Sequence, residues 1–397
     1  MSSDITTHSP DIDLSVLTRN RRTLGVGVII SLLLFLFLEI NYGWRQGALF
    51  IVGLGAGVIL YHAAFGFTSA WREVANTGRG AGLRAQMLML AVTVLIFTPL
   101  IAQGELFGVN VRGSVAPLNL AVVCGAFMFG LGMQLGGGCA SGTLFTAGGG
   151  NTRMMITLAA FIVGSLLGTW QWHLWQDVPS VPPIALTQSF GLLGGMIGSL
   201  VLFAAVWYAT ILYEKKKYGE VVAEPRSNFS VLRGPWPLVA GALALVLVQV
   251  ATLVLAGRPW GVTSAFALWG AKIAGLTGLD VSLWPYWDRA GQAASLDQSV
   301  FNDITSIMNF GIMLGALVAA ALARKFSPSP KMPNGHIMAA IIGGLMLGYG
   351  ARIAFGCNIG AYFSGISSTS MHGWVWFAAA FAGSIIGTKL RPRFGLT

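Results

Sequence analysis

Two cysteines of the chain, Cys139 and Cys357, stand at the start of short segments rich in glycine. Cys139 lies in LGGGCASGTLFTAGGG, residues 135–150, and Cys357 lies in GARIAFGCNIGAYFSG. Because glycine breaks helices and lets backbones approach closely, the residues between the two glycine triplets are expected to form a short helix with exposed ends. The first turn of such a helix presents free backbone N–H groups, which favour an anion. A thiol in that turn can donate S–H to a soft acceptor, so the motif favours a small sulfur-containing anion.

The two cysteine motifs are copies within an internal repeat. The segment GAFMFGLGMQLGGGCASGTLF, from Gly125, aligns with GGLMLGYGARIAFGCNIGAYF, from Gly343, at a constant separation of 218 residues. Cys139 falls on Cys357, and glycines match at 125/343, 130/348, 132/350, 138/356 and 142/360. Downstream GSLLGT matches GSIIGT, and upstream FGFTSAW matches WGVTSAF. Close helix packing explains recurring glycines but not two aligned cysteines, so we interpret the pattern as a true repeat.

The composition indicates which elements must position these cysteines. Of the 397 residues, 55% are hydrophobic and only 10% are charged, and the mean hydropathy is +0.71. These values predict an all-α, polytopic bundle of membrane helices, because a helix of about 20 residues crosses a hydrocarbon core of about 30 Å. Ten spans are expected, with nine as the alternative: 24–40, 47–65, 86–102, 118–135, 154–174, 189–212, 236–256, 306–323, 336–355 and 374–390.

The distribution of charge predicts the orientation. Basic residues cluster before the first span, after the second, in the central loop, before the ninth and at the end of the chain: Arg19, Arg21, Arg22, Arg72, Arg79, Arg84, Lys215, Lys216, Lys217, Arg226, Arg233, Arg324, Lys325, Lys331, Lys389, Arg391 and Arg393. The positive-inside rule then places both termini and the central loop in the cytoplasm, and the acidic loop of residues 280–303 outside. The net charge of +10 therefore reports orientation in an inner membrane and not nucleic-acid binding.

This orientation makes the repeat an inverted one. Residues 118–150 run inward, whereas residues 336–370 run outward. In transporters, interrupted helices from such repeats meet near the membrane midplane and form the substrate site. The expected organisation is a cytoplasmic tail without a cleavable signal peptide (1–23), a first membrane repeat (24–212), a cytoplasmic loop (213–235), a second, inverted repeat (236–390) and a cytoplasmic tail (391–397).

Other polar residues near the cysteines are candidates for the substrate pathway. Arg352 lies inside an apolar span, where an unpaired charge is expensive; it is either functional or reaches out to the interface. Its repeat counterpart is Gln134, and Ser141 and Asn358 beside the cysteines can donate hydrogen bonds to the oxygens of an anion. Cys124 has no counterpart and is expected to be a small buried hydrophobe. The candidate pathway comprises Cys139, Cys357, Gly137, Gly138, Gly356, Gly360, Ser141, Asn358, Arg352, Gln134, Gly66 and Gly261.

The motifs GGGCASGTLF, GARIAFGCNIGAYFSG and FTSAW resemble the YeeE/YedE family of sulfur-transport membrane proteins, over about residues 45–390. The resemblance implies uptake of thiosulfate or a related sulfur anion through an hourglass-shaped pathway, with the ion passed between thiols by weak hydrogen bonds. It also implies a small cytoplasmic sulfur-carrier protein as partner. Its motif residues fall on Gly137, Gly138 and Cys139, and on Gly356, Cys357 and Gly360. Members commonly carry a further cysteine where this chain has Gly66.

Enzyme motifs are absent from the sequence. It has no Cys-x-x-Cys, no zinc-spaced Cys/His cluster and no phosphate-binding loop, so neither a cofactor nor a metal is expected. Two alternatives to transport remain open. One is a membrane redox protein that cycles Cys139 and Cys357 through a disulfide, which requires Cα atoms within about 7 Å. The other is a membrane scaffold that holds a cytoplasmic sulfurtransferase through the loop of residues 213–233.

Overall fold

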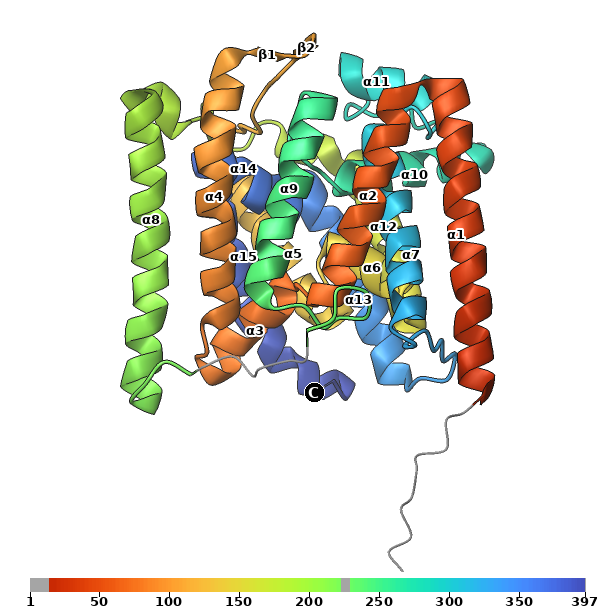
Figure 1. Ribbon diagram of the computed structural model, residues 1–397. Coiled ribbons are helices and arrows are strands. Elements are labelled where there is room, and N and C mark those ends of the chain that lie inside the picture. Colours follow the sequence, from red (N-terminus) through yellow and green to blue (C-terminus); the bar gives the residue numbers. More distant parts are fainter. Residues whose placement is uncertain (1–13, 223–228, 397) are drawn as a thin grey trace, which may run out of the picture.

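The computed structural model describes residues 14–222 and 229–396 and is built almost entirely of helices (Figure 1). The long helices are α1 (Leu14–Tyr42), α2 (Trp44–Ala63), α4 (Ala81–Gln103), α5 (Leu120–Gly136), α7 (Thr152–Trp170), α8 (Leu186–Tyr218), α9 (Leu238–Ala256), α12 (Ile304–Leu322), α13 (Asn334–Ile353) and α15 (Met371–Leu390). Shorter helical elements lie between and after them: α3 (Phe67–Thr77), α6 (Ala140–Gly148), η1 (Gln171–Trp175), α10 (Thr263–Leu276), α11 (Ala290–Asp297), the π-helical turn η2 (Asn358–Phe363), α14 (Ser364–Ser367) and η3 (Arg391–Phe394). Two antiparallel strand pairs complete the described chain: β1 (Glu105–Leu106) with β2 (Val109–Asn110), and β3 (Leu118–Asn119) with β4 (Ser180–Val181).

The expected membrane spans all fall on long helices. Within the described ranges, nine helices are long and apolar enough to cross a membrane, when α2 is counted with α3, α5 with α6, and α13 with η2 and α14. The tenth expected span corresponds to α15, which is helical but is not among those nine. The chain is an all-α polytopic membrane bundle, as predicted.

Helices extend into two segments that the sequence analysis treats as tail and loop. α1 begins at Leu14, so residues 14–23 are helical, and residues 1–13 of the expected tail lie outside the described residues. α8 continues to Tyr218, so the expected loop of residues 213–235 begins as helix, and its residues 223–228 also lie outside the described residues.

The two copies of the repeat run in opposite directions. Figure 1 shows the start of α1, the end of α8, the start of α9 and the C-terminal end together at the lower face, and α11 and the β1–β2 hairpin at the upper face. Following the chain between these points, α5 runs from the upper to the lower face and α13 runs from the lower to the upper face. The direction of the cysteine motifs is therefore inverted between the two halves.

The two halves interlock through close helix crossings. α5 packs against α13 and α15, and α13 packs against α7 as well. At the α7–α13 crossing, a Cβ atom on Gly348 would lie 2.2 Å from the Phe161 carbonyl oxygen, and a Cβ atom on Gly164 would lie 2.3 Å from the Leu345 carbonyl oxygen. No side chain fits at such distances, so the repeated glycines set the helix spacing.

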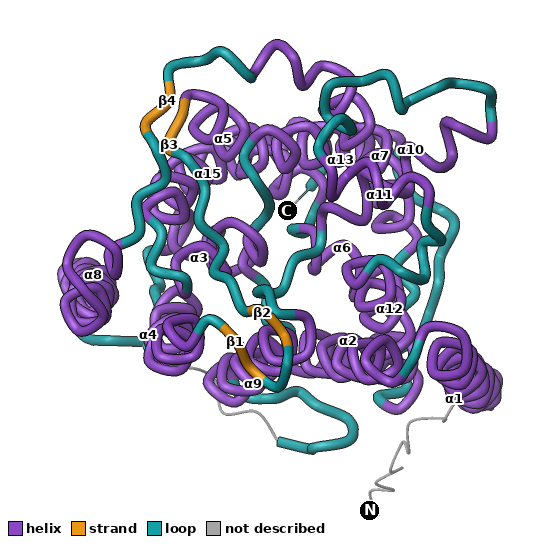
Figure 2. The backbone as a smooth tube through the Cα atoms, turned by 90° about the horizontal axis from the view of Figure 1, so that it is seen from above, coloured by secondary structure: helices purple, strands orange, loops and turns teal. Residues whose placement is uncertain are grey.

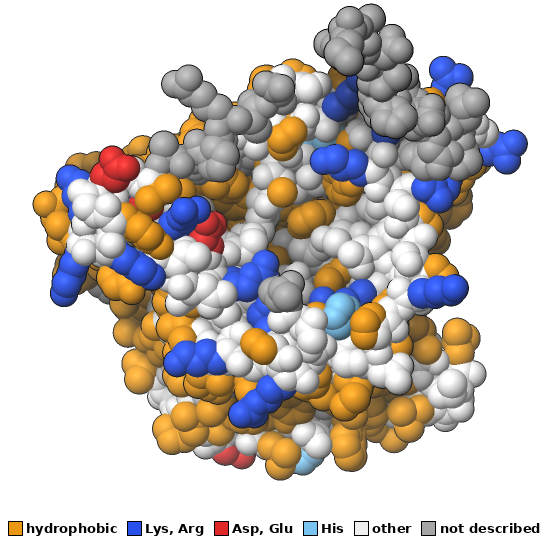
Figure 3. All heavy atoms as spheres, turned by 90° about the horizontal axis from the view of Figure 1, so that it is seen from below, with side chains coloured by type: hydrophobic (Ala, Val, Ile, Leu, Met, Phe, Trp, Pro, Cys, Tyr) orange, Lys and Arg blue, Asp and Glu red, His pale blue; other side chains and the backbone are white. Residues whose placement is uncertain are grey.

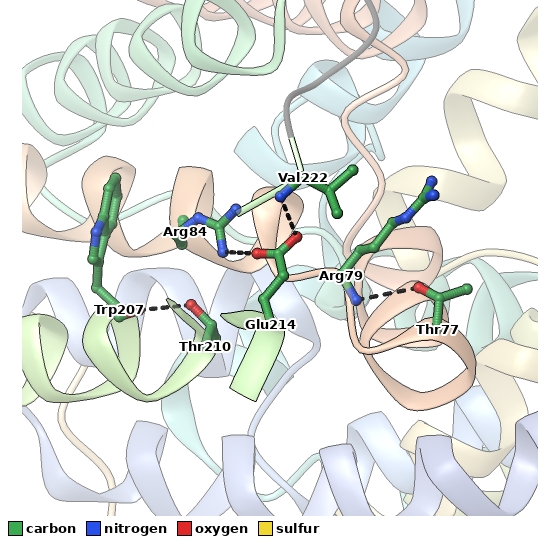
Figure 4. A network of polar contacts seen from close by, with 7 residues as sticks. All are labelled: Thr77, Arg79, Arg84, Trp207, Thr210, Glu214 and Val222. Carbon is green, nitrogen blue, oxygen red and sulfur yellow. Dashed lines mark hydrogen bonds and ion pairs between the residues drawn. The ribbon is translucent and has the colours of Figure 1, made fainter. Parts of the chain in front are cut away.

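α1 and α8 stand at opposite edges of the bundle when it is viewed from above (Figure 2). A buried ion pair ties the lower end of α8 to α4: Arg84 Nη1 lies 2.6 Å from Glu214 Oε2, and the backbone N–H of Val222 donates to the other carboxylate oxygen over 3.3 Å (Figure 4). At the upper end, the N–H of Leu186 donates to the carbonyl oxygen of Thr369 over 2.9 Å. The peripheral helix α8 is thus attached at both ends.

Candidate functional site

Cys139 precedes the first turn of α6 and caps it. Its Sγ accepts a hydrogen bond from the N–H of Gly142 over 3.4 Å and lies 3.4 Å from Ser141 Oγ. Its carbonyl oxygen accepts hydrogen bonds from the N–H and the hydroxyl of Thr143, over 2.7 and 2.8 Å. Both the thiol and Ser141 are buried. The sulfur therefore takes the N-cap position that an oxygen usually holds, and its place over the first turn is fixed.

Cys357 occupies the equivalent position before η2. The residue is fully buried, and its carbonyl oxygen accepts hydrogen bonds from the N–H groups of Ala361 and Tyr362, over 2.8 and 3.3 Å. The first turn here is π-helical and continues into α14, whereas Cys139 begins a nine-residue α-helix. Both cysteines are free thiols in the structure. The two short half helices expected from the glycine pattern are present, but they differ in helix type.

The glycine before each cysteine packs closely against the backbone of the turn that follows. A Cβ atom on Gly138 would lie 3.1 Å from the backbone nitrogen of Thr143, and one on Gly356 would lie 2.9 Å from the backbone nitrogen of Ala361. Gly356 also has a φ of +146°, which side chains rarely adopt. Only glycine fits at position 356 without strain, and in both copies the glycine before the cysteine lies close to the backbone of the following turn.

The structure brings the two cysteine elements together. α6 contacts η2, and the thiols of Cys139 and Cys357 lie within electrostatic range of each other. Although the two thiols are 218 residues apart in the sequence, they share one region inside the bundle. Within the described ranges, no group of three His, Cys, Asp or Glu residues is placed to hold a metal ion.

Polar groups and open space adjoin Cys357. Asn358 is fully buried, and neither atom of its carboxamide has a hydrogen-bond partner among the described residues. Leaving a buried polar group unpaired costs about 1–3 kcal/mol, so a polar partner would stabilise this amide. A Cβ atom on Gly360 would meet nothing within 4 Å, and the same holds for Gly261, which lies just before α10. Ser114, in the segment that joins β2 to β3, donates to the Gly360 carbonyl oxygen over 3.4 Å.

Gln134 joins several elements at the lower end of α5. Its side-chain Nε2 donates to the Thr68 carbonyl oxygen over 3.0 Å and to Ser384 Oγ over 2.7 Å. The backbone carbonyl oxygen of Gln134 accepts a hydrogen bond from Arg391. These bonds connect α3, α15 and η3 to α5. Gly66 is the residue before α3, and its carbonyl oxygen accepts hydrogen bonds from the backbone N–H of Ala70 and the hydroxyl of Ser69.

Arg352 contacts a different cluster from the cysteines. Its guanidinium carbon lies 4.9 Å from the centre of the Tyr286 ring, in the segment between α10 and α11. A Cβ atom on Gly168 would lie 2.7 Å from Arg352 Cβ, so the stem of the side chain packs on α7. Arg352 Nε and Nη1 are buried without hydrogen-bond partners among the described residues. The cation–π contact thus stabilises a charge that the sequence assigned to the pathway.

Two arginines that were not among the candidate residues lie close to the Gly-Gly-Cys loop. Arg153 donates to the Leu135 carbonyl oxygen, and Arg391 Nη1 donates to the Gln134 carbonyl oxygen over 2.8 Å. Burial, together with the positive charges of Arg72 and Arg153, lowers the pKa of Arg391 to about 10. One signal was available: Arg153 lies three residues after the second glycine triplet, at the start of an apolar run.

A membrane bundle whose two halves run in opposite directions, with helices interrupted at a shared internal region, has the architecture of a transporter. The family model described as sulphur transport matches residues 62–386, and the chain therefore belongs to the sulphur transport family. The resemblance recognised in the cysteine motifs is confirmed.

Individual relatives cover most of the chain. The thiosulfate transporter TsuA of Spirochaeta thermophila is 29% identical over 337 residues, which cover 82% of this chain and 92% of that protein. TsuA of Escherichia coli is 24% identical over 342 residues, covering 83% and 90% of the two chains. The probable transporter YedE of Escherichia coli is 32% identical over 161 residues, covering 40% and 39%.

Proposed function

We propose that the chain carries thiosulfate, or a closely related sulfur oxyanion, across the inner membrane along a pathway that passes Cys139 and Cys357. The observation that carries the proposal is that two buried cysteines stand at the first turns of two helical elements that touch each other, beside the amide of Asn358, which has no hydrogen-bond partner among the described residues. The similarity to proteins named thiosulfate transporters supports the choice of anion.

The chemistry of the proposed site suits an anion with both sulfur and oxygen atoms. A neutral thiol donates S–H to the soft sulfur end, whereas a thiolate would repel the anion. The carboxamide of Asn358 and the hydroxyl of Ser141 donate to the oxygens, and backbone N–H groups of the first turn of α6 add positive potential. Each of these contacts contributes on the order of 0.5–1.5 kcal/mol, which is weak enough for the ion to leave.

The proposed pathway contains two thiols, because Gly66 stands where other family members commonly have a further cysteine. We propose that the lower face, which holds both described ends of the chain and most of the basic clusters, is cytoplasmic. A small sulfur-carrier protein would then receive the anion's sulfur on that side.

Uptake of isotopically labelled thiosulfate into proteoliposomes tests this function. Cys139→Ala and Cys357→Ala should each insert normally, since shortening a small side chain disturbs little packing, and each should sharply reduce uptake. Cys124→Ala is the matched control and should transport like the parent protein, because Cys124 lies in the first turns of α5 and has no counterpart in the repeat. Uptake must be compared at equal protein abundance in the membrane.

Serine variants distinguish the proposal from its two alternatives. A hydroxyl remains a hydrogen-bond donor, so Cys139→Ser and Cys357→Ser should retain partial uptake. A serine cannot form a disulfide, and a redox mechanism therefore predicts complete loss in both serine variants. If both alanine variants transport like the parent, the cysteine pathway is wrong and the scaffold alternative is favoured.

A further inference from the structure

A polar cavity lies at the upper end of the bundle, between α4, the start of α8 and the end of α14. Its volume is about 240 Å³, and Figure 1 shows α14 beside α4 in the upper half of the bundle. Polar side chains from all three elements line it: Thr98, Thr187, Gln188, Ser367, Ser368 and Thr369. Gln188 and Ala102 in this lining are exposed, whereas Thr98 and Ser367 are buried. The cavity is therefore reached from the surface and ends at hydroxyl groups.

Two of these hydroxyl groups have no partner. Thr98 is 4% exposed and Ser367 is fully buried, and neither hydroxyl makes a hydrogen bond among the described residues. A buried polar group left unpaired costs free energy, so each of these oxygens would be stabilised by a polar ligand. One water molecule has a share of about 30 Å³ in the liquid, so the cavity has room for an ion together with water.

The cavity lies at the C-terminal end of the helical segment that follows Cys357. η2 and α14 together run from Asn358 to Ser367. The last carbonyl groups of a helix lack intrahelical partners, and this end carries partial negative charge. Among the described residues, the Ser367 carbonyl oxygen accepts no backbone hydrogen bond, whereas that of Ile366 accepts one from Thr369. This end of the segment favours a cation, just as its first turn, beside Cys357, favours an anion.

The lining offers oxygen atoms rather than free N–H donors. The N–H groups of Ser368 and Thr369 donate within the turn that ends α14. Those of Thr187 and Gln188 donate to Thr369 Oγ1 and to the Ala185 carbonyl oxygen, over 3.4 and 3.0 Å. Both the donors and the acceptors of backbone hydrogen bonds thus leave mainly hydroxyl and carbonyl oxygens available to a ligand.

The absence of charge from this lining narrows the choice of ligand. Among the described residues that line the cavity, none is charged or titrates near neutral pH, so none can pair with an anion or carry a proton. Lys and Arg side chains gather instead on the lower face (Figure 3). Divalent cations usually take carboxylate ligands. A monovalent cation that accepts neutral oxygen ligands fits the cavity best.

Ser114 connects the two ends of the helical segment. Its hydroxyl donates to the Gly360 carbonyl oxygen over 3.4 Å, in the turn after Cys357, and its N–H donates to Ser368 Oγ over 2.9 Å, in the cavity lining. One residue therefore contacts both the proposed anion pathway and the cavity. In transporters with interrupted helices, helix N-termini face anionic substrate groups and the C-terminal ends of half helices coordinate Na⁺.

We propose that the cavity binds Na⁺ and that this ion enters together with the sulfur oxyanion. The hydroxyl oxygens of Thr98 and Ser367 and the carbonyl end of α14 supply the ligands. The coupling rests on the proposed function, because it takes the transported anion as the co-substrate. A cation that moves with the anion offsets part of the work of bringing negative charge to the negative side of a membrane. Na⁺ is the monovalent metal cation that cells keep low inside, so its gradient points inward.

Binding of radiolabelled Na⁺ to the purified full chain tests the site without transport. Thr98→Val and Ser367→Ala should each weaken binding by about tenfold or more, because even the loss of an outer-shell partner weakens metal binding about ten- to hundredfold. Thr98→Ser keeps the hydroxyl and should retain most of the affinity. Thr93→Val is the matched control: it removes a buried hydroxyl from the same helix, one that donates to the Met89 carbonyl oxygen over 2.7 Å and is not part of the cavity lining.

Thiosulfate uptake into proteoliposomes, with an inward gradient of either Na⁺ or choline, tests the coupling. The parent protein should lose most of its uptake in choline, and Thr98→Val should need about tenfold more Na⁺ than the parent, in line with its weaker binding. Thr93→Val should behave like the parent. Uptake by the parent that is equal in choline and in Na⁺ overturns the coupling.

The two assays separate failure of this site from failure of the proposed function. If the parent carries no sulfur anion yet binds Na⁺ in a manner that depends on Thr98 and Ser367, the proposed function fails and the Na⁺ site stands. If the parent carries thiosulfate but binds no Na⁺, the site is overturned and the proposed function stands. Na⁺ binding that is equal in the parent, Thr98→Val and Ser367→Ala also overturns the site.

Discussion

Gly130 of α5 and Gly383 of α15 lie at one helix crossing, and each packs against the backbone of the other helix. A Cβ atom on Gly130 would lie 1.9 Å from the Ala380 carbonyl oxygen, and a Cβ atom on Gly383 would lie 2.0 Å from the Phe127 carbonyl oxygen. Their repeat counterparts, Gly348 and Gly164, make the same kind of approach between α13 and α7. Much of the glycine pattern therefore serves helix packing between the two halves, and only the glycines beside the cysteines shape the site.

Gly130→Ala should destabilise the folded bundle, because the methyl group has no room unless α5 and α15 separate. Overpacking of this kind typically costs about 1–3 kcal/mol, and the rigid backbone oxygen places this site at the upper end. Thermal unfolding in detergent measures the loss. Gly55→Ala in α2 is the control, since its Cβ atom would meet nothing within 4 Å. Equal melting temperatures for the two variants would contradict the close crossing.

Gly360→Ala should reduce thiosulfate uptake without lowering the melting temperature. Its added methyl group enters open space beside the Cys357 turn, so packing is unchanged while the proposed pathway is narrowed. Gly275→Ala, at another open position, should keep full uptake. Gly356→Ala differs from both, because its φ of +146° and its short contact predict a loss of stability together with uptake. Normal uptake by Gly360→Ala would place the pathway elsewhere.

Breaking the Arg84–Glu214 pair should loosen α8. Glu214→Gln leaves the Arg84 charge in a buried position without its partner, and the loss of one member of such a pair typically costs about 3–5 kcal/mol. Replacing both residues with methionine should recover most of that loss. Thermal unfolding of Arg84→Met, Glu214→Met and the double variant forms the required cycle. A double variant as unstable as the worse single variant would argue against an energetic role for the pair.

Labelling of introduced cysteines should confirm the orientation in cells. In a Cys124→Ala background, cysteines introduced at Lys216 and Asp297 both lie at exposed positions, on opposite faces of the bundle. An impermeant thiol reagent added to intact cells should label position 297 and not position 216. Permeabilised cells, in which both positions should react, provide the control. Labelling of position 216 from outside would reverse the proposed sidedness.

Local sequence patterns predicted the long helices because an apolar run of sufficient length can satisfy its backbone in a membrane only as a helix. The same reasoning did not give α3 and α10 as helices, since their short sequences, around the two Thr-Ser-Ala motifs, lack the length of a span. Aligned cysteines and glycines predicted two equivalent half helices, because a repeated backbone geometry needs the same residues twice. The different helix type of η2 was not visible in that alignment.

Long-range contacts were the part that the sequence could not predict. Gln134 was expected in the pathway from its alignment with Arg352, yet its hydrogen bonds reach Thr68 and Ser384, 66 and 250 residues away. Arg391 was assigned only to orientation, and its bond to Gln134 spans 257 residues. Such partners are determined by how the two halves pack together, and a local sequence pattern does not predict that packing.

The interlocking of the two halves has a consequence for biosynthesis. α5 and α6 leave the ribosome long before α13 and α15, since Gln134 and its partner Ser384 are 250 residues apart. Until then, the glycine-lined face of α5 has no permanent neighbour in the lipid, and the half helix after Cys139 lacks the element that it contacts in the finished bundle. Insertion into the membrane and acquisition of the native fold are therefore separate events for this chain. Nascent chains that stop before α13 should remain sensitive to quality-control proteases.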